Sequence, residues 1–130
     1  DKAQKADAEL WLDGGHNPAG GIAVAATLAR MPARPTHLIC GMLNTKDVTG
    51  YLRPLAAQAV SLTAVSIPGE ANTLPAAETE AAARAAGFAR TATAPGVAEA
   101  LAQIAAADPQ ARVLICGSLY LAGQVLKQNG

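Results

Sequence analysis

The sequence predicts an α/β protein: a single three-layer, Rossmann-like domain in which helices cover both faces of a mostly parallel sheet. The length of 130 residues suits one domain with a substantial core. Short, nearly continuous apolar runs alternate with helix-like stretches of about 10 to 13 residues, which is typical of strands buried on both faces. Hydrophobic residues make up 51% of the chain and aromatic residues only 3%, which favours close-packed helices.

Five apolar runs are expected to form the strands. In chain order they are Glu9–Asp13, Thr36–Gly41, Val60–Ile67, Phe88–Thr93 and Arg112–Gly117. The fourth run is the least apolar of the five. Because helix-like stretches separate the runs, we expect parallel strands joined by right-handed crossovers.

Four helices are expected between these strands and a fifth at the end of the sequence. In chain order they are Pro18–Met31, Asp47–Gln58, Pro75–Ala86, Val97–Ala107 and Leu119–Lys127. Proline suits the first helical position, which Pro18 and Pro75 would occupy. Glycine suits the C-cap of a helix, which predicts that Gly87 ends the third helix.

The corner after the first strand carries more special residues than a turn requires. Asn17 is expected to cap the following helix, whose free amides and dipole favour an anion or a polar ligand group. Asp13 either accepts hydrogen bonds from a ribose or helps to hold a hydrated metal, or it only ties down the turn. His16 either contacts a ligand or substrate or is a structural histidine with satisfied hydrogen bonds.

Two glycines, Gly20 and Gly21, fall in the first turn of that helix. Each costs about 1 kcal/mol relative to alanine in a helix. That cost suggests close approach by another backbone, a ligand or a second domain.

Polar residues also follow the second and the fifth expected strands. In the second corner, Thr45 or Asp47 is expected to cap a helix, and Lys46 either reaches an anionic substrate or transferred phosphate or is solvated. In the third corner, Gly117 permits a sharp exit from the strand, and Ser118 either caps the last helix or holds a carboxylate. Ligands of parallel α/β sheets bind beyond the carboxyl ends of the strands. The three corners are therefore expected to share one rim, which is the candidate site.

Several function classes are disfavoured. The formal net charge is zero, so neither nucleic acid nor an anionic membrane surface is indicated. No apolar run reaches the roughly 18 to 20 residues of a membrane span. The sequence contains no GxxxxGK[ST] phosphate loop, and GGHNPAGG does not fit GxGxxG. No CxxC or HExxH pattern supplies metal ligands.

The two cysteines, Cys40 and Cys116, both lie in the local sequence LICG. We expect free buried thiols of a cytoplasmic protein rather than a disulfide. Neither has a neighbouring base that would activate it as a nucleophile. Trp11 and Tyr120 are expected in the core, and His37 is expected to begin a strand. Taken alone, the domain can bind and orient a ligand, but its sequence shows no complete catalytic apparatus.

Three motifs together resemble a known family. LDGGHNPAG at 12–20, ICGMLNTKD at 39–47 and VLICGSLYLAGQVL at 113–126 are similar to the C-terminal domain of folylpolyglutamate synthase / dihydrofolate synthase, a branch of the Mur ligase superfamily. The resemblance covers essentially the whole chain, in the family's order. Gly15 stands where the family commonly has alanine.

The resemblance implies that residues 1–130 are a Mur ligase C-terminal (glutamate ligase) domain, and that an N-terminal P-loop domain lies outside this chain. In this family ATP phosphorylates the carboxylate of dihydropteroate or folate, and the amine of L-glutamate then attacks the acyl phosphate to form an amide. The implied cofactors are ATP and Mg²⁺, with the magnesium ligands in the N-terminal domain and no metal ligand here. The chain would close over ATP and position glutamate, and would be inactive alone.

Residue roles follow from the same resemblance. Asp13 resembles the acid that contacts ATP near its ribose, and Asn17 is a further candidate contact to ATP. His16 and Ser118 resemble residues near glutamate and the reacting centre, with His16 positioning the substrate. Lys46 is a further candidate for binding glutamate. An arginine that usually precedes the first motif is missing, so the chain is expected to begin just after it.

Two alternatives remain open from the sequence. A ligase of the same superfamily that acts on peptidoglycan precursors is disfavoured by GSLYLAG at 117–123. A free-standing nucleotide-binding or regulatory module without chemistry is the other alternative.

Overall fold

The computed structural model describes residues 9–12, 18–32, 34–42, 47–67 and 73–116. These residues form one five-stranded sheet with the strand order β1-β5-β2-β3-β4, and every neighbouring pair is parallel. The strands are β1 (Glu9–Leu12), β2 (Thr36–Cys40), β3 (Ser61–Ala64), β4 (Thr91–Thr93) and β5 (Arg112–Cys116). All five expected strands are confirmed.

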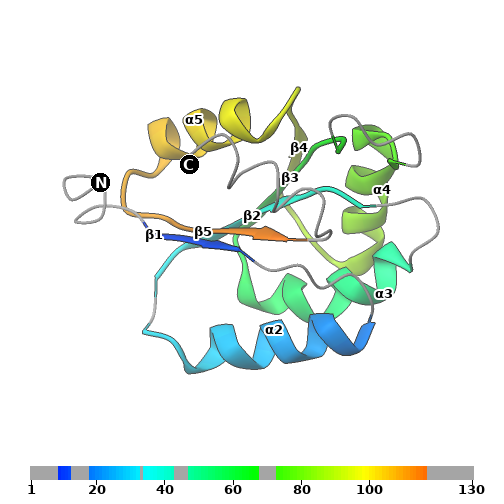
Figure 1. Cartoon of the computed structure of the whole chain (residues 1–130). Helices are drawn as coiled ribbons and strands as arrows, with labels where there is room; N and C mark the ends of the chain where they lie inside the picture. The colour runs from blue at the N-terminus through cyan, green and yellow to red at the C-terminus, as the bar shows by residue number, and fades with distance from the viewer. Residues whose placement is uncertain (1–8, 13–17, 33, 43–46, 68–72, 117–130) are drawn as a thin grey trace.

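The helices cover both faces of the sheet, as expected (Figure 1). They are α2 (Pro18–Arg30), α3 (Val48–Leu52), the 3₁₀ helix η1 (Arg53–Gln58), α4 (Ala76–Ala86) and α5 (Val97–Ala107). The first four lie on one face, and α5 lies alone among the described helices on the other (Figure 1). The expected helix at 119–127 lies outside the described residues. No described helix is long and apolar enough to cross a membrane.

The expected helix Asp47–Gln58 is wrong in one respect, because it is two helices. Its start is confirmed: the Gly50 amide donates to the Asp47 carboxylate at 3.0 Å, so Asp47 is the N-cap. The α-helix then ends at Leu52 and a 3₁₀ helix continues, with Pro54 in its first turn. A proline inside an α-helix lacks the amide for the i−4 bond and clashes with that carbonyl. The tighter helix avoids this conflict.

The end of α4 corrects the expected start of the fourth strand. Gly87 is the C-cap, as expected, and has the left-handed φ of 117°. The next residue, Phe88, donates its amide to the Ala83 carbonyl at 3.1 Å and is buried. This contact closes the helix end, so β4 begins only at Thr91. The start of α4 also differs by one residue, since Pro75 is its N-cap.

Two apolar layers hold the domain together. Because successive side chains of a strand point to opposite faces, Leu38 and Cys40 belong to the core under α2, α3 and α4, whereas Ile39 belongs to the core under α5. Tyr51 is fully buried in the first core and Ile115 in the second. The sheet is therefore buried on both faces at its centre, which explains the nearly continuous apolar runs.

The close approach expected at Gly20 and Gly21 is confirmed for Gly21, and its partner is backbone. A Cβ atom at Gly21 would overlap the Tyr51 carbonyl oxygen and would lie 3.2 Å from Cγ of Pro54. Helix α2 thus packs against α3 and η1 at a distance that only glycine permits.

Candidate functional site

Three strand ends meet at the edge of the sheet from which the chain leaves each strand, here called the carboxyl edge. In the sheet register Leu12 of β1 pairs with Ile115 of β5, and Cys40 of β2 pairs with Cys116 of β5. Neighbouring strands are about 4.8 Å apart, so the ends of β1 and β2 are only about 10 Å apart with β5 between them. The three motif-bearing corners follow these three adjacent ends in the sequence.

The residues assigned to this rim lie outside the described residues. They are Asp13, His16, Asn17, Lys46 and Ser118. Their placement near ATP and glutamate therefore stays a prediction. The described structure brings together the strand ends that precede the three corners.

The strand ends themselves form an apolar floor. Cys40, Met42, Ile115 and Cys116 are all buried. The chain just before α4 also contacts this edge, because the Leu74 amide donates to the Met42 carbonyl at 2.8 Å. The four side chains of the floor are therefore shielded from solvent.

The two cysteines are free buried thiols, as expected. They face each other across β2 and β5 on the side of the sheet that packs against α2–α4. A hydrogen bond with the Cys116 thiol and complete burial raise the pKa of the Cys40 thiol well above its usual range. Because the thiolate is the nucleophilic form, this rise disfavours Cys40 as a nucleophile.

The opposite edge of the sheet, here called the amino edge, holds a polar cluster that the sequence did not reveal. His37 begins β2, as expected, and is buried. Its Nδ1 lies 2.6 Å from Oγ of Ser61, and its Nε2 lies 3.3 Å from Oδ2 of Asp108. When Nε2–H donates to the carboxylate, Nδ1 accepts the Ser61 hydroxyl proton. The imidazole thus joins β2 and β3 to the C-terminal end of α5.

The described part of the chain holds no cluster of side chains that could bind a metal ion. No group of three or more His, Cys, Asp or Glu side chains there is placed to hold a metal ion.

The family model described as "Mur ligase, glutamate ligase domain" matches residues 2–119. The chain belongs to this family. The match and the parallel sheet confirm the fold and family expected from the three motifs. The matched range includes all five residues assigned to the rim, although it does not test their roles.

Solved structures of longer chains show the same fold. Folylpolyglutamate synthase of Mycobacterium tuberculosis, crystallised with ADP and AMPPCP, is 32% identical with a TM-score of 0.79, over 93% of this chain and 29% of that one. A second structure of that enzyme, complexed with ADP, is 30% identical with a TM-score of 0.81, over 93% of this chain and 30% of that one. This chain thus spans less than a third of the length of these structures.

A more distant relative resembles the chain in fold alone. The bifunctional folylpolyglutamate synthase/dihydrofolate synthase of Yersinia pestis, with AMPPNP and Mn, is 24% identical with a TM-score of 0.79. That match covers 92% of this chain and 28% of the other. No curated protein sequence matches the chain.

Proposed function

We propose that this chain is the C-terminal, glutamate-positioning domain of an ATP-dependent ligase that adds L-glutamate to dihydropteroate or folate. The observation that carries the proposal is the adjacency of the ends of β1, β5 and β2 in a chain of the glutamate ligase family. Each of these strands leads into one of the three motifs. The similarity to a folylpolyglutamate synthase at 32% identity favours the folate branch.

In this proposal the rim holds two substrates. Asp13 accepts hydrogen bonds from the ribose of ATP, and Asn17, beside the N-terminus of α2, adds a polar contact. His16 and Ser118 hold glutamate so that its amine faces the activated carboxylate. Lys46 supplies positive charge for a glutamate carboxylate.

Acyl-phosphate chemistry depends on positioning and on exclusion of water rather than on a covalent nucleophile. The apolar floor at Cys40, Met42 and Cys116 suits this task, because its side chains are buried from solvent. The raised pKa of Cys40 likewise favours a mechanism without a thiolate. Magnesium bound in the N-terminal domain would neutralise charge on the transferred phosphoryl group.

The partner implied by this scheme is a P-loop domain of the same cytoplasmic protein. The phosphate loop and metal ligands would come from that domain, and this chain would close over the bound nucleotide as a lid. The chain alone would then have no ligase activity.

The test is ADP release by the complete protein, with its N-terminal domain, supplied with MgATP. Release should require both L-glutamate and dihydropteroate or tetrahydrofolate, and the isolated chain should release none. Release with a muramyl-peptide precursor alone would assign the protein to the cell-wall branch instead. No release with any combination would leave a nucleotide-binding module and overturn the proposal.

A further inference from the structure

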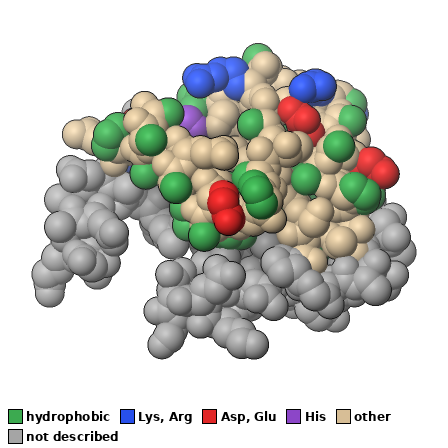
Figure 2. Space-filling model, turned by 90° about the horizontal axis from the view of Figure 1, so that it is seen from above, with side chains coloured by type: hydrophobic (Ala, Val, Ile, Leu, Met, Phe, Trp, Pro, Cys, Tyr) green, Lys and Arg blue, Asp and Glu red, His purple; other side chains and the backbone are tan. Residues whose placement is uncertain are grey.

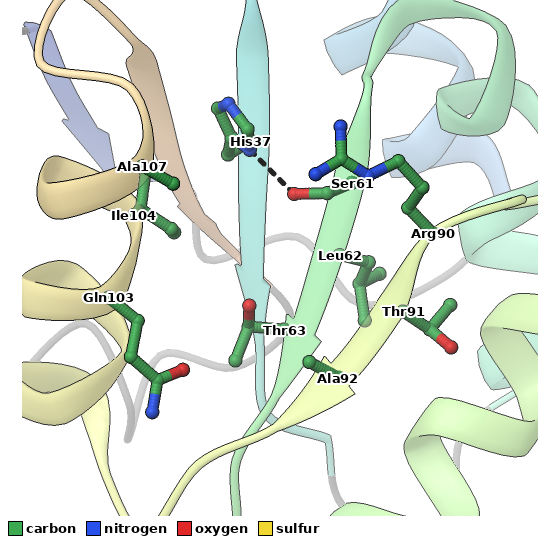
Figure 3. Close-up of a pocket in the computed structure, with 10 residues that line it drawn as sticks. All are labelled: His37, Ser61, Leu62, Thr63, Arg90, Thr91, Ala92, Gln103, Ile104 and Ala107. Carbon is green, nitrogen blue, oxygen red and sulfur yellow. Dashed lines mark hydrogen bonds between the residues drawn. The ribbon is translucent and has the colours of Figure 1, made fainter.

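A cavity of about 170 Å³ lies on the α5 face of the sheet, between α5 and the strands β3 and β4 (Figure 3). It sits at the amino edge, at the opposite end of the strands from the rim. His37, Ser61, Thr63 and Arg90 line it from the sheet, and Gln103 and Ile104 line it from α5. Ligand binding in this cavity would therefore be independent of the proposed ligase function.

A row of polar side chains crosses the sheet beside this cavity. His37 pairs with Ser61 in the register of β2 and β3, and Leu62 pairs with Thr91 in that of β3 and β4. One step earlier along the chain are Ser61 on β3 and Arg90, which immediately precedes β4, so these two residues share a sheet face. Figure 3 shows the three side chains on the same side of the strands, with the Arg90 guanidinium directed toward Ser61.

The side chains of this row differ in whether their polar groups have hydrogen-bond partners. His37 bonds to both Ser61 and Asp108, so their polar atoms have partners. For the guanidinium of Arg90 the described residues supply neither a hydrogen bond nor an ion pair, and the residue is exposed. Figure 2, seen from the side of α5, shows basic side chains near the histidine along one margin of the described surface. A planar cationic group with five donors is thus available at the mouth of the cavity.

Apolar side chains also line the cavity, Ala92 from β4 and Ile104 and Ala107 from α5. Thr91 and Leu62 belong to the lining as well, but the Leu62 side chain packs in the core on the opposite face of the sheet. A cavity of about 150 Å³ lined by apolar side chains accommodates benzene, so this one has room for a single six-membered ring. The Arg90 guanidinium matches the charge and the fork geometry of a carboxylate.

We propose that this amino-edge cavity binds a small monocarboxylate that carries one ring, with the carboxylate on the Arg90 guanidinium and the ring against Ala92 and Ile104. It would be a second ligand site of the domain, separate from the rim. Benzoate is the simplest probe of this chemistry. For its nine non-hydrogen atoms we expect a Kd on the order of 1 mM.

The experiment is a titration of the ¹⁵N-labelled 130-residue chain with benzoate, followed by amide chemical shifts. The amides of Ser61, Arg90 and Ala92 should move saturably, and those of Cys40 and Cys116 at the carboxyl edge should not. Benzamide has the same ring without the charge and should bind about tenfold more weakly. No saturable shift at the cavity, or shifts confined to the carboxyl edge, would overturn the proposal.

Three variants distinguish specific benzoate binding in the cavity from a general affinity of the protein for anions. Arg90→Gln should weaken benzoate about tenfold. The matched control Arg53→Gln, an exposed arginine on η1 at the other face of the sheet, should bind like the parent chain. Ala92→Leu should abolish binding by filling the cavity, while the exposed edge-strand position keeps the fold intact. Equal weakening by Arg90→Gln and Arg53→Gln would contradict the assignment.

Discussion

The two edges of this sheet use polar residues in opposite ways. At the carboxyl edge β2 and β5 end in buried apolar side chains and buried thiols, and the polar residues of the motifs follow in the sequence. At the amino edge the strands themselves carry polar side chains, and His37 links Ser61 to Asp108. The chain has only two histidines: His37 lies at the amino edge, and His16 follows β1 in the sequence. A histidine or serine in this fold therefore indicates a function only together with the end of the strand at which it lies.

The largest expected effect contrasts the two histidines. In the complete protein, His16→Ala should lower turnover on the order of 100-fold, because the substrate loses its positioning contact, and Asp13→Ala should act similarly. Denaturant unfolding of both should stay close to the parent protein.

His37→Ala should show the reverse pattern. It leaves Ser61 and Asp108 without their partner, so the free energy of unfolding should fall by about 1–3 kcal/mol, with turnover nearly unchanged. Steady-state kinetics and urea unfolding of the same preparations check both variants. If His37→Ala lost activity and His16→Ala did not, the assignment of the edges would be reversed.

Gly21→Ala tests whether helix propensity or packing decides the stability of the domain at this position. Alanine is better than glycine in a helix by about 1 kcal/mol. Here the added methyl group would overlap the Tyr51 carbonyl, so we expect a net loss of about 1–3 kcal/mol in unfolding free energy. The control is Ala26→Gly, at an exposed position on the same helix. It should lower the unfolding free energy only by the difference in helix propensity between alanine and glycine. A stabilised Gly21→Ala protein would rule out the close approach of α2 to α3.

A smaller effect concerns the pH dependence of stability at the carboxyl edge. The pKa of Cys40 is raised in the folded chain, by its hydrogen bond with Cys116 and by burial. Above pH about 8.5 the thiol ionises in the unfolded chain while the folded chain keeps its proton. The unfolding free energy should therefore fall as pH rises in this range, by at most about 1.4 kcal/mol per pH unit for one thiol. Cys40→Ala should flatten that slope in urea unfolding at pH 8 to 10, and an unchanged slope would exclude this thiol as the cause.

Much of the fold could be predicted because its signals are local. Apolar runs of a few residues marked the strands, and the caps at Asp47 and Gly87 marked helix ends. The break at Pro54 was also a local signal, since the proline was visible in the sequence. The role of Phe88 was harder to predict, because an apolar residue after a C-cap closes a helix as readily as it begins a strand.

The arrangement of the two edges could be predicted only in part. Parallel strands imply that the motif corners share an edge, but the position of β5 between β1 and β2 requires the strand order. The contacts of His37 join residues 24 and 71 positions apart in the sequence. They depend on the register of β2 against β3 and on where α5 ends, which no local pattern specifies.

We propose that glutamate is held at the carboxyl edge. The most direct test compares one serine assigned to each edge. The KM for L-glutamate would be measured in the complete protein for Ser118→Ala and Ser61→Ala. We expect Ser118→Ala to raise this KM about tenfold through loss of a hydrogen bond to a carboxylate, and Ser61→Ala to leave it within about twofold of the parent value. A raised KM in Ser61→Ala with a normal KM in Ser118→Ala would contradict the account.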